Sequence, residues 1–251
     1  MTTVNDVCRY IDSFAPFDAA EGWDNVGLLL GDGAAAVTGM VTALDLTADI
    51  LNEAAGVGAN LVVTHHPVIF DPIKKLESTN VVYRAARLGV HVISAHTSLD
   101  VAPEGVNQAL AETLQLRDPA PLCEDGLGRI GLLPYPMAAN QLAAYVKERL
   151  GCKGLRYYAG PGPITCVAVC GGAGGSLLEE ARQQGAQALV TADVKHNVFL
   201  DAKNCNMTLI DGGHFATENV IIPRLAALLR RRFPQLPVTV ASANVEVTDW
   251  L

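Results

Sequence analysis

Three short stretches place histidine and carboxylate side chains directly after runs of strand-forming residues. The first is THHP at residues 64–67, the second is SAHTSLD at residues 94–100, and the third is IDGGHFATE at residues 210–218. In open α/β sheets, ligands bind outside the carboxyl ends of the strands. The three stretches therefore predict one pocket that is lined by imidazole and carboxylate groups.

Imidazole and carboxylate groups together are typical ligands of divalent cations. His214 and Glu218 are four residues apart at the start of a predicted helix, so they share a face and can hold one cation. Surface helices also show this spacing by chance. His65 and His66 are adjacent, and we expect their side chains to diverge. They either serve two neighbouring ions, or one binds an ion while the other packs in the core.

Asp100 favours the two-ion interpretation. A carboxylate can bridge two cations, and hydrolytic two-metal sites hold their ions about 3.5–4 Å apart. His96 lies four residues before Asp100. It is either a further ligand or a residue that orients one. Among the residues outside the ligand set, His96 is also the candidate catalytic acid or base.

Short β-branched runs alternate with helical patterns along the whole chain, which predicts an α/β fold with layered sheets. The predicted strands are 26–30, 37–46, 60–64, 90–95, 128–134, 163–170, 187–191 and 207–210. The predicted helices are 4–14, 48–56, 80–88, 104–114, 140–150, 176–185, 194–202 and 217–232. The three chemical stretches thus lie at the ends of strands.

One composition shift indicates a domain boundary. Residues 117–125 (RDPAPLCED) combine two prolines with acidic residues between a predicted helix and the next strand. We therefore expect a metal-binding α/β lobe formed by residues 1–122 and 207–251, and a second α/β lobe formed by residues 123–206.

Composition excludes several classes of function. Of the 251 residues, half are hydrophobic and 18% are charged, which is typical of a folded protein with a sizeable core. The formal net charge of −8 makes nucleic acid an improbable partner, because phosphate backbones require a basic face. The run Arg230–Arg232 closes a predicted helix, and we favour a solvated helix end over a docking patch.

Six scattered cysteines without a C-x-x-C pair predict reduced thiols. The amino-terminal stretch reads as an amphipathic helix with acidic residues, not as a signal peptide, and no apolar run is long enough to span a membrane. We therefore expect a cytoplasmic protein that does not engage a membrane.

Four stretches together resemble a known family. They are EGWDNVGLLLGD (residues 21–32), VTHHPVIF (63–70), SAHTSLDVAPEGVN (94–107) and DGGHFATEN (211–219). In this order they are similar to the YbgI-like, or Nif-three-like, dinuclear metal-centre family, whose members are named type 2 GTP cyclohydrolase I homologs. The resemblance covers most of the chain. It implies two intertwined α/β lobes with mixed sheets, and a ring-shaped homohexamer with metal sites facing an inner cavity.

The resemblance also implies the metal ligands. They fall on His65, His66, Asp100, His214 and Glu218, all of the expected types. One stretch departs from the family pattern: in TADVKHN (residues 191–197), Ala192 replaces a glycine and Asn197 occupies the position of a terminal histidine. If that histidine takes part in chemistry, this chain lacks it.

A glycine-rich stretch, CGGAGGS at residues 170–176, follows a predicted strand. Its backbone amides could receive a phosphate group, although it matches neither the P-loop nor the dinucleotide fingerprint. A tight structural turn is the interpretation that we favour.

The sequence thus predicts a metal-dependent hydrolase with two divalent ions, namely Zn, Fe, Mn or Co, because these metals suit mixed nitrogen and oxygen ligands. The resemblance implies a GTP cyclohydrolase-like activity on a nucleotide or cyclic amide, whereas the residues themselves do not select GTP. The alternative is a non-catalytic metal carrier, insertase or regulatory scaffold, which would use the same five ligands.

Overall fold

The computed structural model describes residues 1–251, and the chain divides into two compact units. The first unit comprises Met1–Ala102 and Ile222–Val245, and the second comprises Pro103–Ile221 and Glu246–Leu251. The chain therefore passes from the first unit to the second, returns, and ends in the second. This path confirms two intertwined α/β lobes, each with its own mixed sheet.

The first unit is built on a five-stranded sheet in the order β1-β4-β3-β2-β11. Its strands are β1 (Gly27–Leu30), β2 (Met40–Ala43), β3 (Leu61–Thr64), β4 (His91–Ser94) and β11 (Val238–Val240). The pairs β11–β2, β2–β3 and β3–β4 are parallel, and β1 pairs antiparallel with β4. Ala43, Thr64 and Ser94 are register partners, so the carboxyl ends of β2, β3 and β4 meet at one edge.

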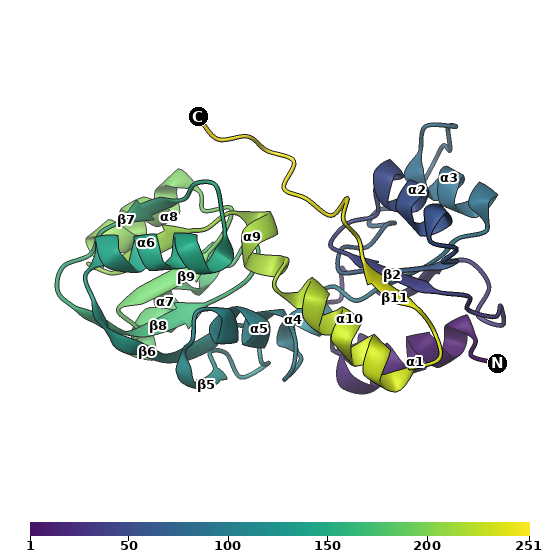
Figure 1. The fold of residues 1–251 in the computed structure, drawn as a ribbon. Coiled ribbons are helices and arrows are strands. Elements are labelled where there is room, and N and C mark those ends of the chain that lie inside the picture. Colours follow the sequence, from purple (N-terminus) through teal and green to yellow (C-terminus); the bar gives the residue numbers. More distant parts are fainter. The chain divides into compact units, whose positions relative to one another are not determined.

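Helices cover both faces of this sheet. Figure 1 shows α2 (Ala48–Gly56) and α3 (Val81–Leu88) on one face, with α1 (Val4–Phe14) and α10 (Ile221–Arg232) on the other. Strands buried on both faces read as continuous apolar runs, as β2 and β3 do. The short α4 (Thr97–Val101) and the 3-10 helix η1 (Phe17–Ala19) complete the unit.

The second unit is built on a six-stranded sheet in the order β5-β6-β8-β9-β10-β7. Its strands are β5 (Arg117–Pro121), β6 (Arg129–Met137), β7 (Arg156–Tyr158), β8 (Ile164–Val169), β9 (Ala188–Thr191) and β10 (Thr208–Asp211). The central pairs β8–β9 and β9–β10 are parallel, whereas β5–β6, β6–β8 and β10–β7 are antiparallel.

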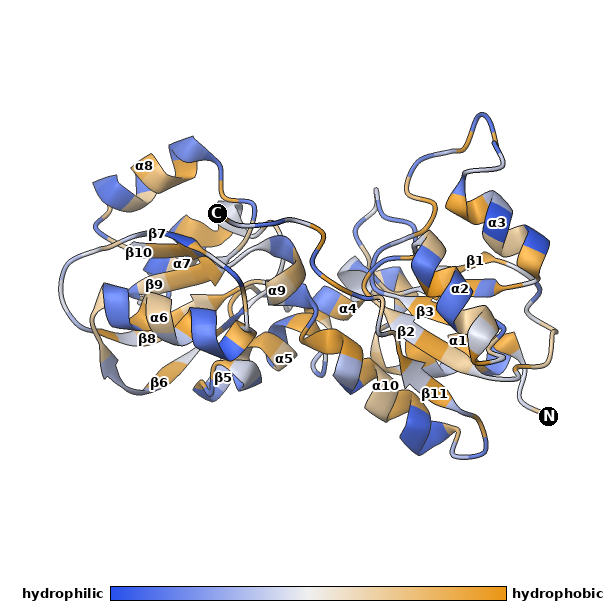
Figure 2. Ribbon diagram, turned by 45° about the horizontal axis from the view of Figure 1, so that its top comes forward, coloured by the Kyte–Doolittle hydropathy of each residue, from blue (hydrophilic) through white to orange (hydrophobic).

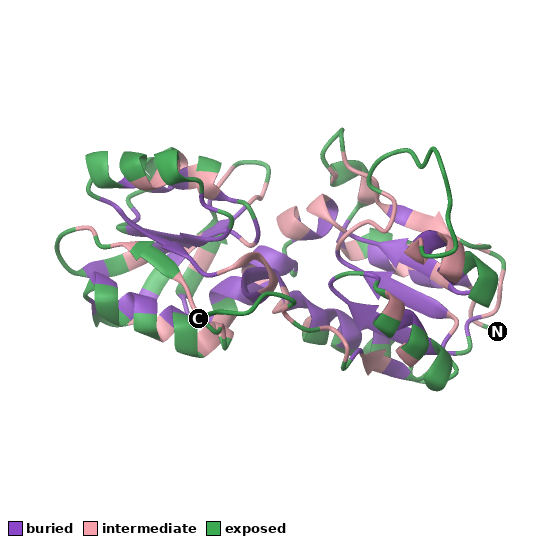
Figure 3. Cartoon of the chain, turned by 90° about the horizontal axis from the view of Figure 1, so that it is seen from above, coloured by how far each residue is buried: buried purple, intermediate pink, exposed green.

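Alternating residues of the central strands face two separate cores. Val167 and Val169 pack with α5 (Val106–Thr113) and α6 (Ala139–Leu150). Ala168 packs with α7 (Leu178–Gln183) and α8 (His196–Asn204). The 3-10 helix η2 (Gly175–Leu177) and α9 (His214–Glu218) complete the unit. The central strands of both sheets are largely apolar and buried, as Figures 2 and 3 show.

The unit boundaries differ from those that the sequence predicted at 122/123 and 206/207. The proline-containing stretch after Leu116 is not a linker, because it forms edge strand β5 and pairs with β6. An edge strand tolerates proline, since one side of its backbone needs no ladder partner. β10, predicted to belong to the metal-binding lobe, pairs with β9 and β7 in the second unit. His214 and Glu218 therefore lie in the second unit, not in the unit that holds His65.

Three strands and two α-helices were not predicted, namely β5, β7, β11, α4 and α9; the predicted helix 217–232 overlaps α9 only at its last two residues. Each spans three to five residues, which is too short for a periodic pattern to emerge. None of the helices combines the length and the apolar character that spanning a membrane requires.

Candidate metal centre

The carboxyl edge of the first sheet carries the histidines that the sequence singled out. His65 and His66 follow β3 directly, and His96 comes two residues after β4. Asp45 comes two residues after the adjacent strand β2. Because these three strands are parallel neighbours, their following residues emerge side by side.

The rings of His65 and His66 converge, contrary to the divergence expected for adjacent residues. Their centroids are 5.1 Å apart. The hydroxyl of Thr64 donates a 2.7 Å hydrogen bond to the carbonyl of His66, so the chain turns where the strand ends. The alternation of side chains belongs to extended strands and does not hold beyond this turn.

His96 and Asp100 join these two rings. The His96 centroid lies 5.3 Å from that of His65 and 5.6 Å from that of His66. Each of the three imidazoles offers a ring nitrogen within 4.8 Å of the others, a spacing at which they could hold a metal ion. Asp100 Oδ1 lies 3.6 Å from His65 Nε2. The structure thus brings four predicted site residues together in the first unit.

Aspartates and a carbonyl fix the orientation of these imidazoles. Nδ1 of His66 lies 2.8 Å from Asp45 Oδ1, and Nδ1 of His96 lies 2.9 Å from Asp24 Oδ1. Nδ1 of the fully buried His65 lies 2.9 Å from the carbonyl of Ala95. In a neutral ring, an Nδ1 that donates a proton places the lone pair on Nε2, the atom that binds metals. All three rings are therefore set for coordination through Nε2.

Asp24 has a fully buried side chain. Its second oxygen accepts hydrogen bonds from the backbone amide of Thr97 at 3.0 Å and from the Thr97 hydroxyl. Burial raises the pKa of Asp24, but the hydrogen bonds from Thr97 and His96 outweigh burial, so the net pKa lies below its usual value. Asp24 therefore stays ionised and holds His96 in place.

The second unit holds the other two predicted ligands on the single turn α9. His214 Nε2 lies 2.9 Å from Glu218 Oε2, which confirms that the two side chains share a face. His214 Nδ1 lies 2.7 Å from Asp193 Oδ2. Glu218 is only 4% exposed. The turn starts at Gly213, whose φ of +86° suits glycine, and the Thr217 hydroxyl donates to the carbonyl of Gly213.

Carboxylates on both sides raise the pKa of His214 from 6.5 to about 9. The hydrogen bond to Glu218 is the largest cause, burial opposes it, and Asp193 adds to the rise. The metal-free protein therefore carries a protonated imidazole here at neutral pH.

The glycine-rich loop forms a wall around Glu218. Gly172 has a φ of +61°, and a Cβ atom at this position would lie 2.1 Å from Glu218 Oε1. A Cβ on Gly171 would lie 3.2 Å from Cγ of Glu218. Because Glu218 is buried, its carboxylate has little room to move away. Glycine at position 172 is needed so that the carboxylate can sit where it does.

The amides of this loop bond to oxygen atoms of the same unit. Gly171 donates to Asn107 Oδ1, Gly172 donates to Thr217 Oγ1, and Gly174 donates to Thr191 Oγ1. With these amides engaged, the structure favours the tight turn over a phosphate cradle.

Sequence reasoning did not assign Asp45 or Asp193 to the site. Both lie two residues after a strand, β2 and β9 respectively, at the parallel strand ends where the histidines were sought. Their position just after parallel strands was the sequence feature that could have pointed to both aspartates. Asp24 belongs to the WDN segment of the motif at residues 21–32. In the stretch that departs from the family pattern, Ala192 is buried, and Asn197 lines a cavity with Lys195.

Histidine and carboxylate groups at strand ends, on two mixed α/β units, define a two-lobe α/β protein with groups that could hold metal ions. The sequence matches the Duf34/NIF3 (NGG1p interacting factor 3) family over residues 2–248, so the chain belongs to that family. This match confirms the family resemblance that the four motifs indicated.

Known relatives agree with the family. A protein of Clostridium acetobutylicum named "GTP cyclohydrolase 1 type 2 homolog" is 32% identical, with 97% of each chain covered. The crystal structure of a Staphylococcus aureus hypothetical protein shares 29% identity and a TM-score of 0.93, over 99% of both chains. A Bacillus cereus protein related to NIF3 is 21% identical with a TM-score of 0.95, covering 100% of this chain and 99% of that one, which shows the shared fold.

Replacing Gly172 by alanine should reduce the metal affinity of the protein about tenfold to 100-fold, because the new Cβ displaces the Glu218 carboxylate. Gly185→Ala is a matched control: Gly185 has a φ of +87°, and nothing lies within 4 Å of the added Cβ. It introduces similar backbone strain without touching the site. Isothermal titration with Zn²⁺ measures both variants, and equal losses of affinity would contradict this role of Gly172.

The raised pKa of His214 makes the metal-free protein sensitive to pH. Protonated His214 stabilises the fold fully below pH 6.5, and this contribution disappears as the pH rises through about 9. The difference in unfolding free energy between the wild type and His214→Gln should therefore shrink between these two values. Urea unfolding in the presence of a chelator measures it, and a difference that grows with pH would contradict the assignment.

Proposed function

We propose that the protein is a metal-dependent hydrolase with a dinuclear centre. The proposed ligands are His65, His66 and Asp100 of the first unit and His214 and Glu218 of the second. Two divalent ions held by these residues would polarise the bond under attack and lower the pKa of a water molecule. The observation that carries the proposal is the set of fixed imidazoles, each with Nδ1 bonded to an aspartate or a carbonyl.

The donor chemistry fits such ions. Three imidazoles with two carboxylates form a mixed nitrogen and oxygen set, which suits Zn, Fe, Mn or Co better than Mg. His214 again has Nδ1 bonded to a carboxylate, that of Asp193. Carboxylate–histidine pairs of this kind orient metal ligands in many proteins. Asp100 is the proposed bridge between the two ions.

His96 is the proposed general acid or base. Asp24 holds its Nδ1, so Nε2 is the atom that is placed to accept or donate a proton. Such a pair also orients metal ligands, so turnover of a substrate, and not the pair itself, distinguishes a hydrolase from a carrier or scaffold.

Two exposed aromatic rings lie beside His96. Trp23 is 61% exposed and Phe70 is 50% exposed, and their centroids lie 6.2 Å and 6.3 Å from that of His96. Asn25 donates to the carbonyl of Ile69 at 2.6 Å and ties together the segments that carry the two rings. Such rings can stack on a planar substrate, which supports a nucleotide or cyclic amide. The names of the relatives point to a GTP cyclohydrolase-like reaction.

The remaining proposals concern assembly and compartment. A toroidal homohexamer follows from the family resemblance and is testable by light scattering. All six cysteines are free thiols, which supports a reducing compartment such as the cytoplasm. Nucleic acid stays an improbable partner because of the net charge of −8.

Elemental analysis of the purified protein, after anaerobic reconstitution with metal, should give about two ions per chain. Asp100→Ala should lose both ions if Asp100 bridges them, whereas Glu218→Ala should mainly weaken one. Full metal content in Asp100→Ala would rule out the bridge. If the protein binds no metal even after reconstitution, the proposed metal-dependent mechanism is wrong.

His96→Gln should keep its metal and lose turnover by about 100-fold or more, because a general acid or base is removed while the ligands stay. His91→Gln is the control: His91 is at the start of β4, and its Nδ1 accepts a hydrogen bond from the backbone amide of Asp32. The measurements are metal content and hydrolysis in a screen of nucleotides and cyclic amides.

These outcomes separate the candidate roles. Loss of metal in His96→Gln would make His96 a ligand instead of a base. Fully loaded wild-type protein that hydrolyses nothing and exchanges its metal readily would support the carrier.

A further inference from the structure

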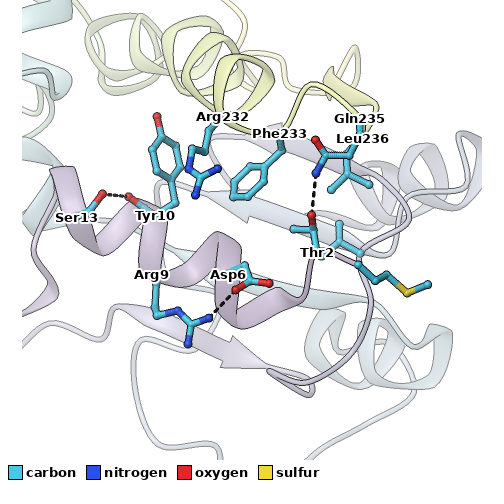
Figure 4. A pocket seen from close by; sticks show the side chains of 11 residues that line it. Thr2, Asp6, Arg9, Tyr10, Ser13, Arg232, Phe233, Gln235 and Leu236 are labelled. Atoms are coloured by element: carbon cyan, nitrogen blue, oxygen red, sulfur yellow. Dashed lines mark hydrogen bonds and ion pairs between the residues drawn. The ribbon is translucent and has the colours of Figure 1, made fainter.

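A cavity lies in the first unit, away from the histidines. Its volume is about 700 Å³, and it opens between the start of α1 and the end of α10 (Figure 4). It is lined by Thr2, Asp6, Arg9, Tyr10, Arg232 and Phe233, among others. Cavities of 300–1,000 Å³ are typical of small-molecule sites.

The direction of the parallel strands separates this cavity from the candidate metal ligands: the two lie at opposite strand ends. Val37, three residues before β2, and Leu236, two residues before β11, both line the cavity. The cavity is therefore at the amino ends of parallel strands, whereas His65 and His66 follow the carboxyl end of β3. A four-residue strand spans about 13 Å, so one small molecule does not reach both.

The exposed Arg232 lies over two aromatic rings that line the cavity. Its guanidinium carbon lies 5.2 Å from the centroid of Phe233 and 5.8 Å from that of Tyr10. The two rings meet edge to face at 5.7 Å, and Figure 4 shows the guanidinium between them. Phe233 is only 3% exposed, so the stacking platform is fixed. No carboxylate forms an ion pair with Arg232, whereas Arg9 pairs with Asp6.

A guanidinium that stacks on rings keeps its N–H groups in one plane for a bidentate partner. The lining carries two arginines against one aspartate, a positive balance on a chain of net charge −8. Tyr10, Phe233, Val37 and Leu236 add apolar surface. The lining thus combines an anchor for an anion with a site for a flat or apolar body.

We propose that this cavity binds a small organic anion, a carboxylate or phosphate monoester with an aromatic or short apolar body. Arg232 is the anchor and Arg9 the second cation. This site is separate from the proposed dinuclear centre and does not depend on it.

Phenyl phosphate is the probe, titrated into the full-length protein at constant ionic strength and followed by isothermal calorimetry. Arg232→Gln should weaken binding about tenfold or more, because a charge-assisted bidentate contact is lost. Arg232→Lys should also weaken binding, since lysine keeps the charge but not the planar fork. Arg231→Gln is the control, because Arg231 is exposed like Arg232 but does not line the cavity; it should change the affinity by less than about twofold.

The same affinity is expected with a chelator present, which distinguishes this site from the metal centre. If Arg231→Gln and Arg232→Gln weaken phenyl phosphate binding equally, binding depends on the overall positive charge of the helix end and not on a specific contact. That result would overturn the proposal. No binding to the wild type at 10 mM phenyl phosphate (about the weakest affinity of interest) would also overturn it. So would a change of oligomeric state in Arg232→Gln by light scattering, because the cavity would then be a contact between copies of the chain.

Discussion

The hydrogen bond between a histidine Nδ1 and an aspartate is the interaction on which the candidate site depends. It occurs at His66, His96 and His214, in two different units. Each bond fixes a ring that could otherwise rotate, and at His66 and His96 it selects the tautomer whose Nε2 can bind a metal. The aspartates follow strand ends or occupy a loop tied to α4, so the sheets position the ligands indirectly. Without these bonds, the histidines would still be present but not oriented.

The second unit adds another means of fixing side chains. Its proposed ligand pair sits on the single turn α9, which is too short to be stable by itself. Hydrogen bonds from the Thr217 hydroxyl and the close approach of Gly172 fix this turn. The glycine-rich loop therefore leaves room for the carboxylate of Glu218. Packing within the unit sets the conformation of the loop. A residue with a side chain at position 172 would compete with the ligand for the same space.

The direction of the parallel strands gives the first unit two chemically different ends. Imidazoles and carboxylates gather at the carboxyl ends, whereas Arg232 and its aromatic rings gather near the amino ends. This separation would let one small sheet carry both proposed sites, one for cations and one for anions. The run Arg230–Arg232 is exposed throughout, as expected of a solvated helix end. Two of its side chains also make specific contacts: Arg230 donates to the carbonyl of Val238, and Arg232 lies over the rings of Phe233 and Tyr10.

The sequence by itself determined the α/β class, most of the longer helices and strands, and the family, because hydrophobic periodicity and the four motifs are local signals. It also indicated that His214 and Glu218 share a helical face, since that follows from the pitch of one turn. Only the tertiary structure decided the unit boundaries, the edge strand β5 and the convergence of His65 with His66. Strand pairing and the turn after β3 are contacts between distant residues or departures from regular backbone, and neither leaves a periodic trace. The partners Asp45 and Asp193 lie 21 residues from their histidines, so only folding brings them into contact.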